Sequence, residues 1–472
     1  MTSFNVFATV DNEGKLIRPS DIDTHEIQAT YQWERDKTRN AILIMGEADR
    51  ARPNALNIVI ADSHGESFGA LTNTPVFYVN SFKHALDTAA RLRKQNFNGY
   101  GMASVYVING PIEEAVKHPC CNTVYLNKFQ MNSKAPEYFP MYALFNCKVT
   151  NSTTTYTIKN GFTLVRVPLY IRTYTFINEE EAMYHRLLSE LLSAPLRSNR
   201  TGVPTRGVFM RTLRFNLTRG NKSVMPILTT KEISFKAVVT ELLWFLRAEQ
   251  NTEYLHKHGV KFWDANTTRE ALDARGLTDY KPGETGPIYG NQWRNWNGID
   301  DYRGIDQLQR VIGLLKTDPW DRRMIVTAWN PEQNDLMCLP PCHYSFQFHV
   351  TPNLKGEAGI LNCAVNMRSA DLALGVPFNI ASYSLLTHIV ALICGMKAGE
   401  IAVNMVDCHL YENHVEGVVE QLNRRPYMFP VLEFDSELIT ATSIDEFANA
   451  DPSQFKLVDY CHYPRIKLDM AV

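Results

Sequence analysis

The first 177 residues of this 472-residue chain predict an α/β fold. Runs rich in β-branched and aromatic residues at 57–60, 105–108 and 123–126 indicate strands, and the stretch 82–92 has helical spacing. Strands that alternate with helices are typical of an α/β domain, and a hairpin is expected across 154–174 at its end. The remaining length is sufficient for a second domain with a core of its own.

The composition excludes several classes of protein. Lys and Arg number 48 against 50 Asp and Glu, and a net charge of -2 gives no electrostatic footprint for nucleic acid or an anionic membrane. The nine cysteines show no CxxC or Cys/His ligand spacing, and Cys120 and Cys121 are too close for an ordinary disulfide or a zinc clip, so no metal is expected. No signal peptide, transit peptide or apolar run of transmembrane length is visible, which predicts a cytoplasmic protein in a reducing compartment.

Cys342 is the candidate nucleophile of the C-terminal half. It follows two prolines and precedes His343, and the prolines restrict the backbone so that the next side chain has a defined direction. Arg322 and Arg323 lie nearby in the sequence, and guanidinium charge favours the reactive thiolate over the thiol. A buried core cysteine beside a satisfied histidine is the commoner fate of such a pair, so other motifs must decide.

A second motif, the run 367–383, suits a nucleotide. Arg368 and Ser369 offer a guanidinium fork and a hydroxyl, which match the oxygens of a phosphate. The amide of Asn379 offers an acceptor beside a donor, which fits the N3–H and O4 edge of uracil, whereas cytosine would favour an aspartic acid. Without this context Asn379 would be read as a helix N-cap.

These motifs, with the later run Asp407-Cys408-His409-Leu410-Tyr411, resemble the thymidylate synthase family over nearly all of residues 178–472. Further blocks occur in the family's order: Arg200-Thr201-Gly202, Leu228-Thr229-Thr230-Lys231, Glu241-Leu242-Leu243-Trp244-Phe245, Trp263-Asp264-Ala265-Asn266, Tyr289-Gly290, Gln292-Trp293-Arg294, Asp321-Arg322-Arg323 and Met470-Ala471-Val472. So many ordered blocks make the resemblance specific. It implies an α+β synthase domain at 178–472.

The resemblance also implies a reaction, the reductive methylation of dUMP to dTMP. Cys342 would attack C6 of the pyrimidine, and C5 would then take a one-carbon unit and a hydride from 5,10-methylenetetrahydrofolate. Arg200, Arg368 and Ser369 would hold the 5′-phosphate. Arg322 and Arg323 would reach the same phosphate from the partner subunit of a homodimer.

The remaining site residues follow from the same resemblance. Glu241 lies in an apolar helical stretch, where burial would raise its pKa and suit it to proton transfer. Tyr289 would assist removal of the C5 proton, and His343 is expected to be a catalytic residue as well. His409 and Tyr411 match the pair that reads the sugar 3′-hydroxyl, whereas Trp263, Asn266, Asp371 and the terminal Val472 match residues that bind or close over folate.

Several positions depart from the family pattern. Pro204, Met210 and Val406 stand where glycine is usual, Met367 replaces a glutamine, and residues 248–251 replace a glycine-containing turn. Glycine usually marks a positive φ or a close backbone approach. These changes therefore predict altered loops with the catalytic set intact.

Three shorter blocks in the N-terminal half resemble dihydrofolate reductase. They are Ile44-Met45-Gly46 with 52–57, then Tyr106-Val107-Ile108-Asn109-Gly110, and Tyr138-Phe139-Pro140. Their position before a synthase domain strengthens the resemblance, because fused reductase-synthase chains place the reductase first. We therefore expect a dihydrofolate reductase-like α/β domain at 1–177.

The NADPH-binding features of that domain are damaged. Glu47 and Asp49 put acids where the anionic cofactor needs donors and positive charge, and Asn109 adds a side chain where the backbone should approach the pyrophosphate. The early loop 11–16 lacks the usual glycine and Pro-Trp signals. Glu26 is the best candidate for the substrate-protonating acid, although an exposed helix acid is an equal alternative. The domain is expected to be a weak or inactive reductase, and NADPH binding is doubtful.

Three alternatives stay open from the sequence. An active bifunctional reductase-synthase would retain both activities. A nucleotide hydroxymethylase would add water to the intermediate, but Asn379 argues against dCMP, and Trp263 with the intact C-terminus favours methylation. A non-catalytic scaffold fits only the first domain, because Cys342, Glu241 and Arg368 are all present in the second.

Overall fold

The computed structural model describes two compact units. Its described residues are 3–10, 16, 25–46, 52, 55–61, 67–71, 74–108, 111–118, 120–128, 139–140, 147–160, 163–298, 304–353, 355–356 and 358–470. Unit 1 comprises residues 1–178 with 459–461, and unit 2 comprises 179–458 with 462–472. The division after residue 178 lies one residue from the expected boundary. The grouping of 459–461 with unit 1 was not foreseen from the sequence.

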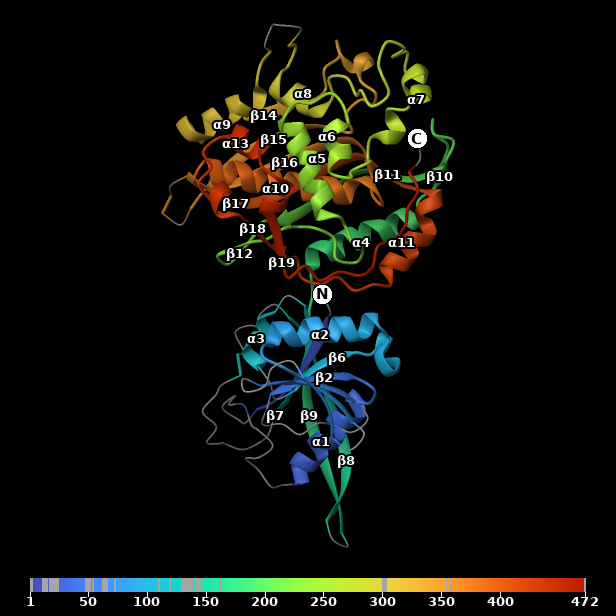
Figure 1. The fold of residues 1–472 in the computed structure, drawn as a ribbon, viewed down its shortest axis with the longest axis vertical. Coiled ribbons are helices and arrows are strands. Elements are labelled where there is room, and N and C mark those ends of the chain that lie inside the picture. The colour runs from blue at the N-terminus through green and yellow to red at the C-terminus, as the bar shows by residue number, and fades with distance from the viewer. Residues whose placement is uncertain are drawn as a thin grey trace. The chain divides into compact units, whose positions relative to one another are not determined.

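Unit 1, drawn in blue to green in Figure 1, is built on one nine-stranded sheet. Its strand order is β4-β5-β3-β2-β6-β1-β7-β9-β8. Its elements are β1 (Phe4–Val10), α1 (His25–Thr38), β2 (Ile42–Gly46), β3 (Leu56–Ile60), β4 (Ser67–Leu71), β5 (Thr74–Val79), α2 (Phe82–Lys94), β6 (Val105–Ile108), α3 (Ile112–Lys117), β7 (Cys121–Lys128), β8 (Cys147–Asn160) and β9 (Thr163–Phe176). The α/β fold is confirmed. The expected strands are β3, β6 and β7, and the expected hairpin is the longer β8–β9 pair.

Helices cover both faces of this sheet. Successive side chains of a strand point to opposite sides, so one strand can contact a helix on each face. On β1, the ring of Phe4 meets Phe82 of α2 edge to face at 5.5 Å. Three residues further on, Phe7 points the other way and meets Trp33 of α1 at 4.9 Å. The central strands β1, β2, β3, β6 and β7 are parallel to their neighbours in this group, as expected for a sheet buried on both faces.

Unit 2 contains a six-stranded sheet with the order β10-β11-β17-β16-β15-β14. The strands of unit 2, in this sheet and in two smaller ones, are β10 (Leu196–Arg197), β11 (Thr205–Asn216), β12 (Thr218–Arg219), β13 (Lys222–Ser223), β14 (Ile325–Thr327), β15 (His343–Pro352), β16 (Ala358–Asp371), β17 (Lys397–Tyr411), β18 (Val431–Phe434) and β19 (Phe455–Val458). Its helices are α4 (Glu179–Leu192), α5 (Phe235–Leu246), α6 (Glu253–Lys257), α7 (Arg269–Ala274), α8 (Tyr289–Arg294), α9 (Gln307–Thr317), α10 (Gly375–Ile393), α11 (Val415–Leu422), α12 (Ser436–Ile439) and α13 (Ile444–Ala448).

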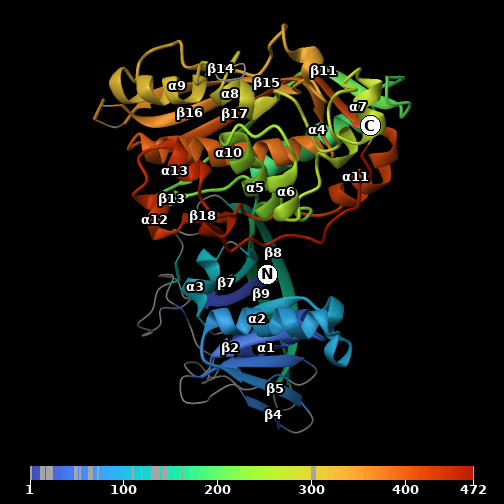
Figure 2. The same ribbon diagram turned by 45° about the horizontal axis from the view of Figure 1, so that its top comes forward.

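Helix α10 forms the core of unit 2 and lies against β16 and β17 (Figure 2). Among the described residues it is the one helix that is long and apolar enough to cross a membrane, so the expectation that no apolar run has transmembrane length is wrong for this segment. Its 18-residue apolar window is 83% buried inside the fold. The apolar composition of α10 therefore reflects packing on all sides of a core helix.

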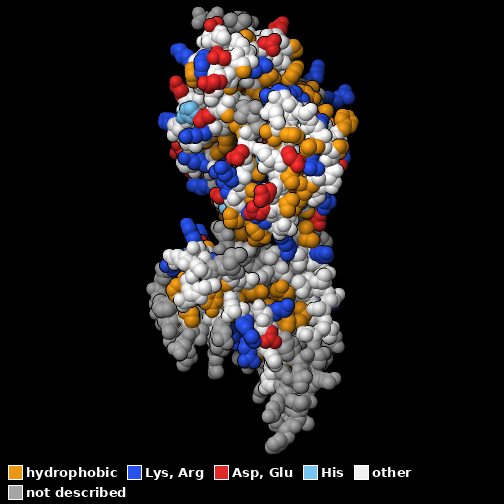
Figure 3. Space-filling model, turned by 90° about the vertical axis from the view of Figure 1, so that its right-hand side faces the viewer, with side chains coloured by type: hydrophobic (Ala, Val, Ile, Leu, Met, Phe, Trp, Pro, Cys, Tyr) orange, Lys and Arg blue, Asp and Glu red, His pale blue; other side chains and the backbone are white. Residues whose placement is uncertain are grey.

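The surface of unit 2 carries interspersed charges. Figure 3 shows one face of the molecule, on which basic and acidic side chains of this unit lie among each other and hydrophobic side chains reach the surface. Large exposed hydrophobic residues include Phe209, Met210, Ile325, Trp329 and Val406, all on or next to strands of the six-stranded sheet.

Two of the glycine replacements keep the glycine-like backbone. Met210 has φ 47° and Ala248 has φ 57°, both in the left-handed region. Residues that carry a side chain therefore adopt the left-handed conformation at these two positions. Ala248 directly follows Arg247, the C-cap of α5, and its N–H donates to the Phe245 carbonyl at 3.0 Å. This is the position after a helix end at which glycine is favoured.

We predict that Ala248→Gly stabilises the protein. Removing the Cβ relieves a left-handed strain of about 1–2 kcal/mol, and the greater freedom of glycine in the unfolded chain takes back about 0.4–1 kcal/mol. Denaturant unfolding should show a net gain of about 0.5–1 kcal/mol. The matched control is Ala274→Gly at the exposed end of α7, which should lose stability because its φ needs no glycine. Loss of stability in both variants would contradict the strain at Ala248.

Candidate active site

Cys342 lies immediately before β15, in a loop that is held from the neighbouring strand β16. The guanidinium of Arg368 donates from Nε to the Pro341 carbonyl and from Nη2 to the Pro340 carbonyl, both at 2.8 Å. The Arg368 N–H also donates to the Cys342 carbonyl at 2.9 Å. Three contacts from one residue, together with two prolines, give the thiol a rigid support.

Burial raises the pKa of the Cys342 thiol, although the charges of Arg368 and Arg200 oppose the shift and Asp371 adds to it. Guanidinium charge thus favours the thiolate in the expected direction, but desolvation is the larger effect in one chain. The predicted source of that charge also differs. Arg322 and Arg323 are exposed, and Arg323 forms an ion pair with Asp321 at 2.8 Å.

Tyr289, the first residue of α8, contacts both Cys342 and His343. Its hydroxyl oxygen accepts the Cys342 N–H at 2.8 Å. Its ring stacks on His343, with centroids 4.0 Å apart and planes inclined by 16°. His343 also forms a hydrogen bond between Nδ1 and the Tyr383 hydroxyl at 2.8 Å, and burial lowers its pKa to about 3. His343 is thus neutral at neutral pH and cannot serve as an imidazolium partner of a thiolate.

Glu241 approaches the same group from α5. Burial raises its pKa to about 7, as expected from its apolar helix, and a hydrogen bond from Trp263 opposes the shift. Trp263 Nε1 donates to Glu241 Oε1 at 2.9 Å, and its ring meets Tyr289 edge to face at 5.9 Å. A carboxyl group with a pKa near 7 can both give and take protons at physiological pH.

The parallel strands β16 and β17 end together and bring a second set of polar side chains to one edge. Asp371 pairs with His409 in the strand register, and Ser369 pairs with Asp407. His409 and Tyr411 meet edge to face at 5.3 Å. One oxygen of Asp371, Oδ1, accepts the N–H groups of Ala373 and Leu374 at 3.1 Å each. No hydrogen bond from the described residues reaches Oδ2.

Asn379 lies on α10, four residues after the helix begins at Gly375. It is therefore not the N-cap of this helix, which is Leu374. Within the described part of the chain its amide makes no hydrogen bond. Asn266 ends a single 3₁₀ turn that begins at Asp264, directly after Trp263. Val472 lies outside the described residues.

Three buried polar residues at this edge were not assigned from the sequence. Lys231 donates through Nζ to the Ala373 carbonyl, and burial lowers its pKa to about 8. His414 lies fully buried with Nε2 at 2.8 Å from the Asp469 carbonyl and Nδ1 at 3.8 Å from Asp371 Oδ1. Glu181 accepts the N–H and hydroxyl groups of two threonines, Thr229 and Thr230. Lys231 belonged to a recognised block and could have been found there.

A rigid cysteine, a buried tyrosine on its amide and a carboxyl group with a pKa near 7 are the groups that an enzyme with a thiol nucleophile and proton transfer requires. A family model described as thymidylate synthase matches residues 182–472. The chain belongs to the thymidylate synthase family.

Individual relatives agree with this assignment. The chain is 43% identical over 301 residues to the thymidylate synthase of human herpesvirus 8, across 62% of this chain and 85% of that protein. It is 43% identical over 333 residues to the probable thymidylate synthase of Schizosaccharomyces pombe, across 68% of this chain and only about half, 52%, of that protein. It is 33% identical over 461 residues to the bifunctional dihydrofolate reductase-thymidylate synthase of Paramecium tetraurelia, across 92% of each chain. This last match extends through unit 1, in agreement with its resemblance to dihydrofolate reductase.

Proposed function

We propose that the chain converts dUMP to dTMP with 5,10-methylenetetrahydrofolate, through addition of Cys342 to C6 of the pyrimidine. The observation that carries the proposal is the contact chain from the Cys342 amide to Tyr289, from Tyr289 to Trp263 and from Trp263 to Glu241. It supports a proton-transfer role for Tyr289 and Glu241 near the thiol of Cys342. Addition at C6 makes C5 a carbon nucleophile, and loss of the C5 proton then needs a base within reach.

The residues would divide the work as follows. Cys342 forms the bond to C6 and leaves again when the C5–C6 double bond returns. Tyr289 and Glu241 take the C5 proton, directly or through water, and His343 supports the ring of Tyr289. The bound folate supplies the one-carbon unit and the hydride that completes the methyl group. Asn379 would read N3–H and O4 of the uracil ring, because one amide presents a matching acceptor and donor.

Two further groups of residues would bind the ends of the ligands. Arg200, Arg368 and Ser369 would hold the 5′-phosphate, and His409 with Tyr411 would read the 3′-hydroxyl. The pterin ring would meet Asp371, whose oxygen Oδ2 accepts no hydrogen bond from the described residues and fits ring N–H donors. Trp263, Asn266 and Val472 would line or close the folate side. Mass spectrometry of the product nucleotide tests the reaction, because a 5-hydroxymethyl product would point to a hydroxymethylase.

We also propose that the active enzyme is a homodimer that joins two copies through the six-stranded sheet. A row of hydrogen-bonded side chains, Thr212-Asn404-Asn366-Ser345, crosses four strands of the sheet at 2.9–3.1 Å. Exposed hydrophobic residues such as Phe209 (79%) and Val406 (41%) lie on the same strands. A monomer gains nothing from exposing such side chains, whereas a second copy would bury them. Partner Arg322 and Arg323 would then add the positive charge that Cys342 lacks in one chain.

Subunit complementation should test the crossing of these arginines. One variant carries Cys342→Ser, and the other carries both Arg322→Glu and Arg323→Glu, so each homodimer is expected to be inactive. After unfolding and joint refolding at equal amounts, hybrids form half of the dimers, and each hybrid contains one site with an intact cysteine and intact partner arginines. Activity should return to about one quarter of the wild-type level. If the arginines act on their own chain, no mixture regains activity.

For unit 1 we propose a reductase-like domain with weak or no reductase activity. Its grounds are sequence changes at Glu47, Asp49 and Asn109, which lie outside the described residues, as does the side chain of Glu26. NADPH oxidation by the full chain, measured with dihydrofolate, should stay at the background rate. Robust dihydrofolate-dependent turnover would favour an active bifunctional reductase-synthase.

A further inference from the structure

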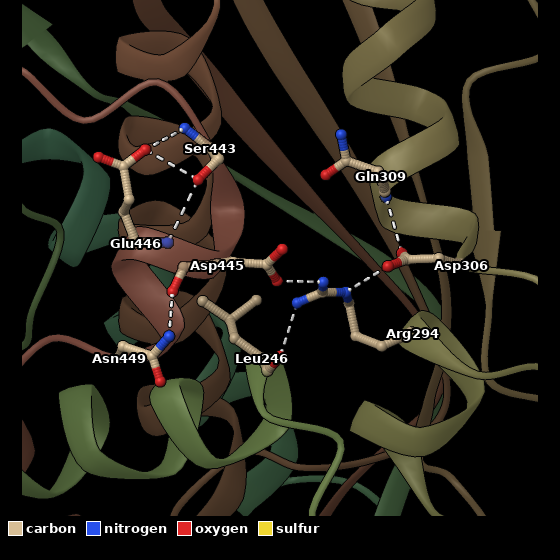
Figure 4. Close-up of polar contacts among 8 residues, drawn as sticks. All are labelled: Leu246, Arg294, Asp306, Gln309, Ser443, Asp445, Glu446 and Asn449. Carbon is tan, nitrogen blue, oxygen red and sulfur yellow. Dashed lines mark hydrogen bonds and ion pairs between the residues drawn. The ribbon is translucent and has the colours of Figure 1, made fainter. Parts of the chain in front are cut away.

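Arg294 joins three elements of unit 2 to the end of α8. Its side chain is 8% exposed and donates three hydrogen bonds (Figure 4). Nε donates to Asp306 Oδ2 at 2.9 Å, Nη1 to the Leu246 carbonyl at 2.7 Å and Nη2 to Asp445 Oδ1 at 2.6 Å. A planar guanidinium holds its donors in fixed directions on three nitrogens and can reach three separated acceptors, whereas the three donors of a lysine all lie on one nitrogen.

The three acceptors are all at defined places in the fold. Leu246 is the last residue of α5, and its carbonyl is one of those that a helix end leaves without an internal partner. Asp306 is the N-cap of α9, where its other oxygen accepts the Gln309 N–H at 2.9 Å. Asp445 lies in the first turn of α13, and its side chain is 67% exposed. The hydrogen bonds of Arg294 to Leu246 and Asp306 are therefore the buried ones.

A second, independent contact fixes α8 against α5. A Cβ atom added at Gly290, the second residue of α8, would lie 2.2 Å from the Phe245 carbonyl oxygen. The two helices thus approach too closely for any side chain at this point. Gly290 sets the distance at the start of α8, and Arg294 sets it at the end.

These two contacts fix the relative position of Glu241 and Tyr289, the two proposed proton-transfer residues. Glu241 lies on α5, five residues before Leu246, and Tyr289 begins α8, five residues before Arg294. At a rise of about 1.5 Å per residue, α8 is only about 9 Å long, so a shift at its end is transmitted to its start. Trp263 contacts both Glu241 and Tyr289 and depends on the same spacing.

We propose that Arg294 is a positioning residue that holds Tyr289 and Glu241 in the arrangement required for proton removal from C5. It acts through the α5–α8 spacing and does not touch the substrate. The inference rests on the proposed function of the site. A displacement of about 1 Å at reacting groups can cost about 100-fold in rate, so a small change of this spacing is sufficient.

The test compares Arg294→Lys with wild type and with Asp445→Asn, a control that changes only the exposed ion pair between Arg294 and Asp445. In the full-length enzyme, Arg294→Lys should lower kcat for dTMP formation by about 10- to 100-fold, with KM for dUMP within about threefold of wild type. Alkylation of Cys342 by iodoacetamide should keep its wild-type rate, because the thiol loop is held by Arg368. The limb of the pH–rate profile near pH 7 should move to lower pH as water reaches Glu241. Asp445→Asn should leave kcat and this limb unchanged.

Gly290→Ala is the second test variant, because it alters the spacing between α5 and α8 from the other end of α8. It should reproduce the fall in kcat and the shift of the pH limb. The inference is overturned if folded Arg294→Lys or Gly290→Ala unfolds at a lower temperature yet keeps the wild-type kcat and pH limb, since Arg294 is then only structural. An inactive wild-type enzyme would instead contradict the proposed function.

Discussion

Cys342→Ser is expected to lower dTMP formation by at least about 10³-fold while the protein stays folded. A serine hydroxyl is a far weaker nucleophile than a thiol near neutral pH, and no other cysteine in the described residues has the contacts to Tyr289 and Arg368 that support Cys342. The rate should be measured as dTMP released with both substrates saturating. Thermal unfolding should show a midpoint close to that of wild type, because the substitution changes one half-buried atom.

Cys338→Ser is the matched control. Cys338 is 3% exposed, four residues before the nucleophile, and burial raises the pKa of its thiol to about 12. Such a thiol is inert at neutral pH. Its loss should therefore keep kcat within about threefold of wild type. Retained activity in Cys342→Ser, or equal losses in both variants, would remove the nucleophilic role of Cys342.

Glu241→Gln should produce the second largest loss, a fall in kcat of about 10²- to 10⁴-fold. The amide keeps the size of the side chain and can still accept the Trp263 hydrogen bond, but it cannot move a proton. The wild-type profile should contain a limb near pH 7 that reflects the raised pKa of Glu241, and the variant should lack this limb. Rates between pH 5.5 and 8.5 would show the difference.

The same substitution should affect stability in the opposite direction. Burial raises the folded-state pKa of Glu241 from 4.5 to about 7. Its contribution to stability is therefore fully present below about pH 4.5 and is lost as the pH rises through about 7. At pH 8 the charged carboxylate costs free energy that glutamine does not, so Glu241→Gln should be more stable than wild type by roughly 2 kcal/mol. Lower stability at pH 8 together with unchanged kcat would contradict both the burial and the role.

The sequence was sufficient to propose candidate residues whose chemistry lies in short motifs. Cys342, Arg368 and Asn379 each occur in a recognisable block, and the raised pKa of Glu241 follows from an apolar helix that carries one acid. The α/β fold of unit 1 followed from the alternation of strands and helices. These are local properties, and local patterns record them well.

Other features depend on the balance of distant contacts. The pKa of the Cys342 thiol is raised because the effect of burial exceeds that of the Arg368 and Arg200 charges. Neither magnitude is visible in a sequence. The strain at Ala248 depends on a backbone angle that the residue type disfavours. Arg294 donates to a main-chain carbonyl 48 residues earlier, and a carbonyl leaves no mark in the amino-acid order.

A covalent trap tests the nucleophilic mechanism most directly. The full-length protein should be incubated with 5-fluoro-dUMP and 5,10-methylenetetrahydrofolate, digested, and analysed by mass spectrometry. Fluorine at C5 blocks proton removal, so the mechanism predicts a stable adduct of nucleotide and folate on the peptide that contains Cys342. Folded protein that forms no adduct, or forms it on another residue, would contradict the mechanism.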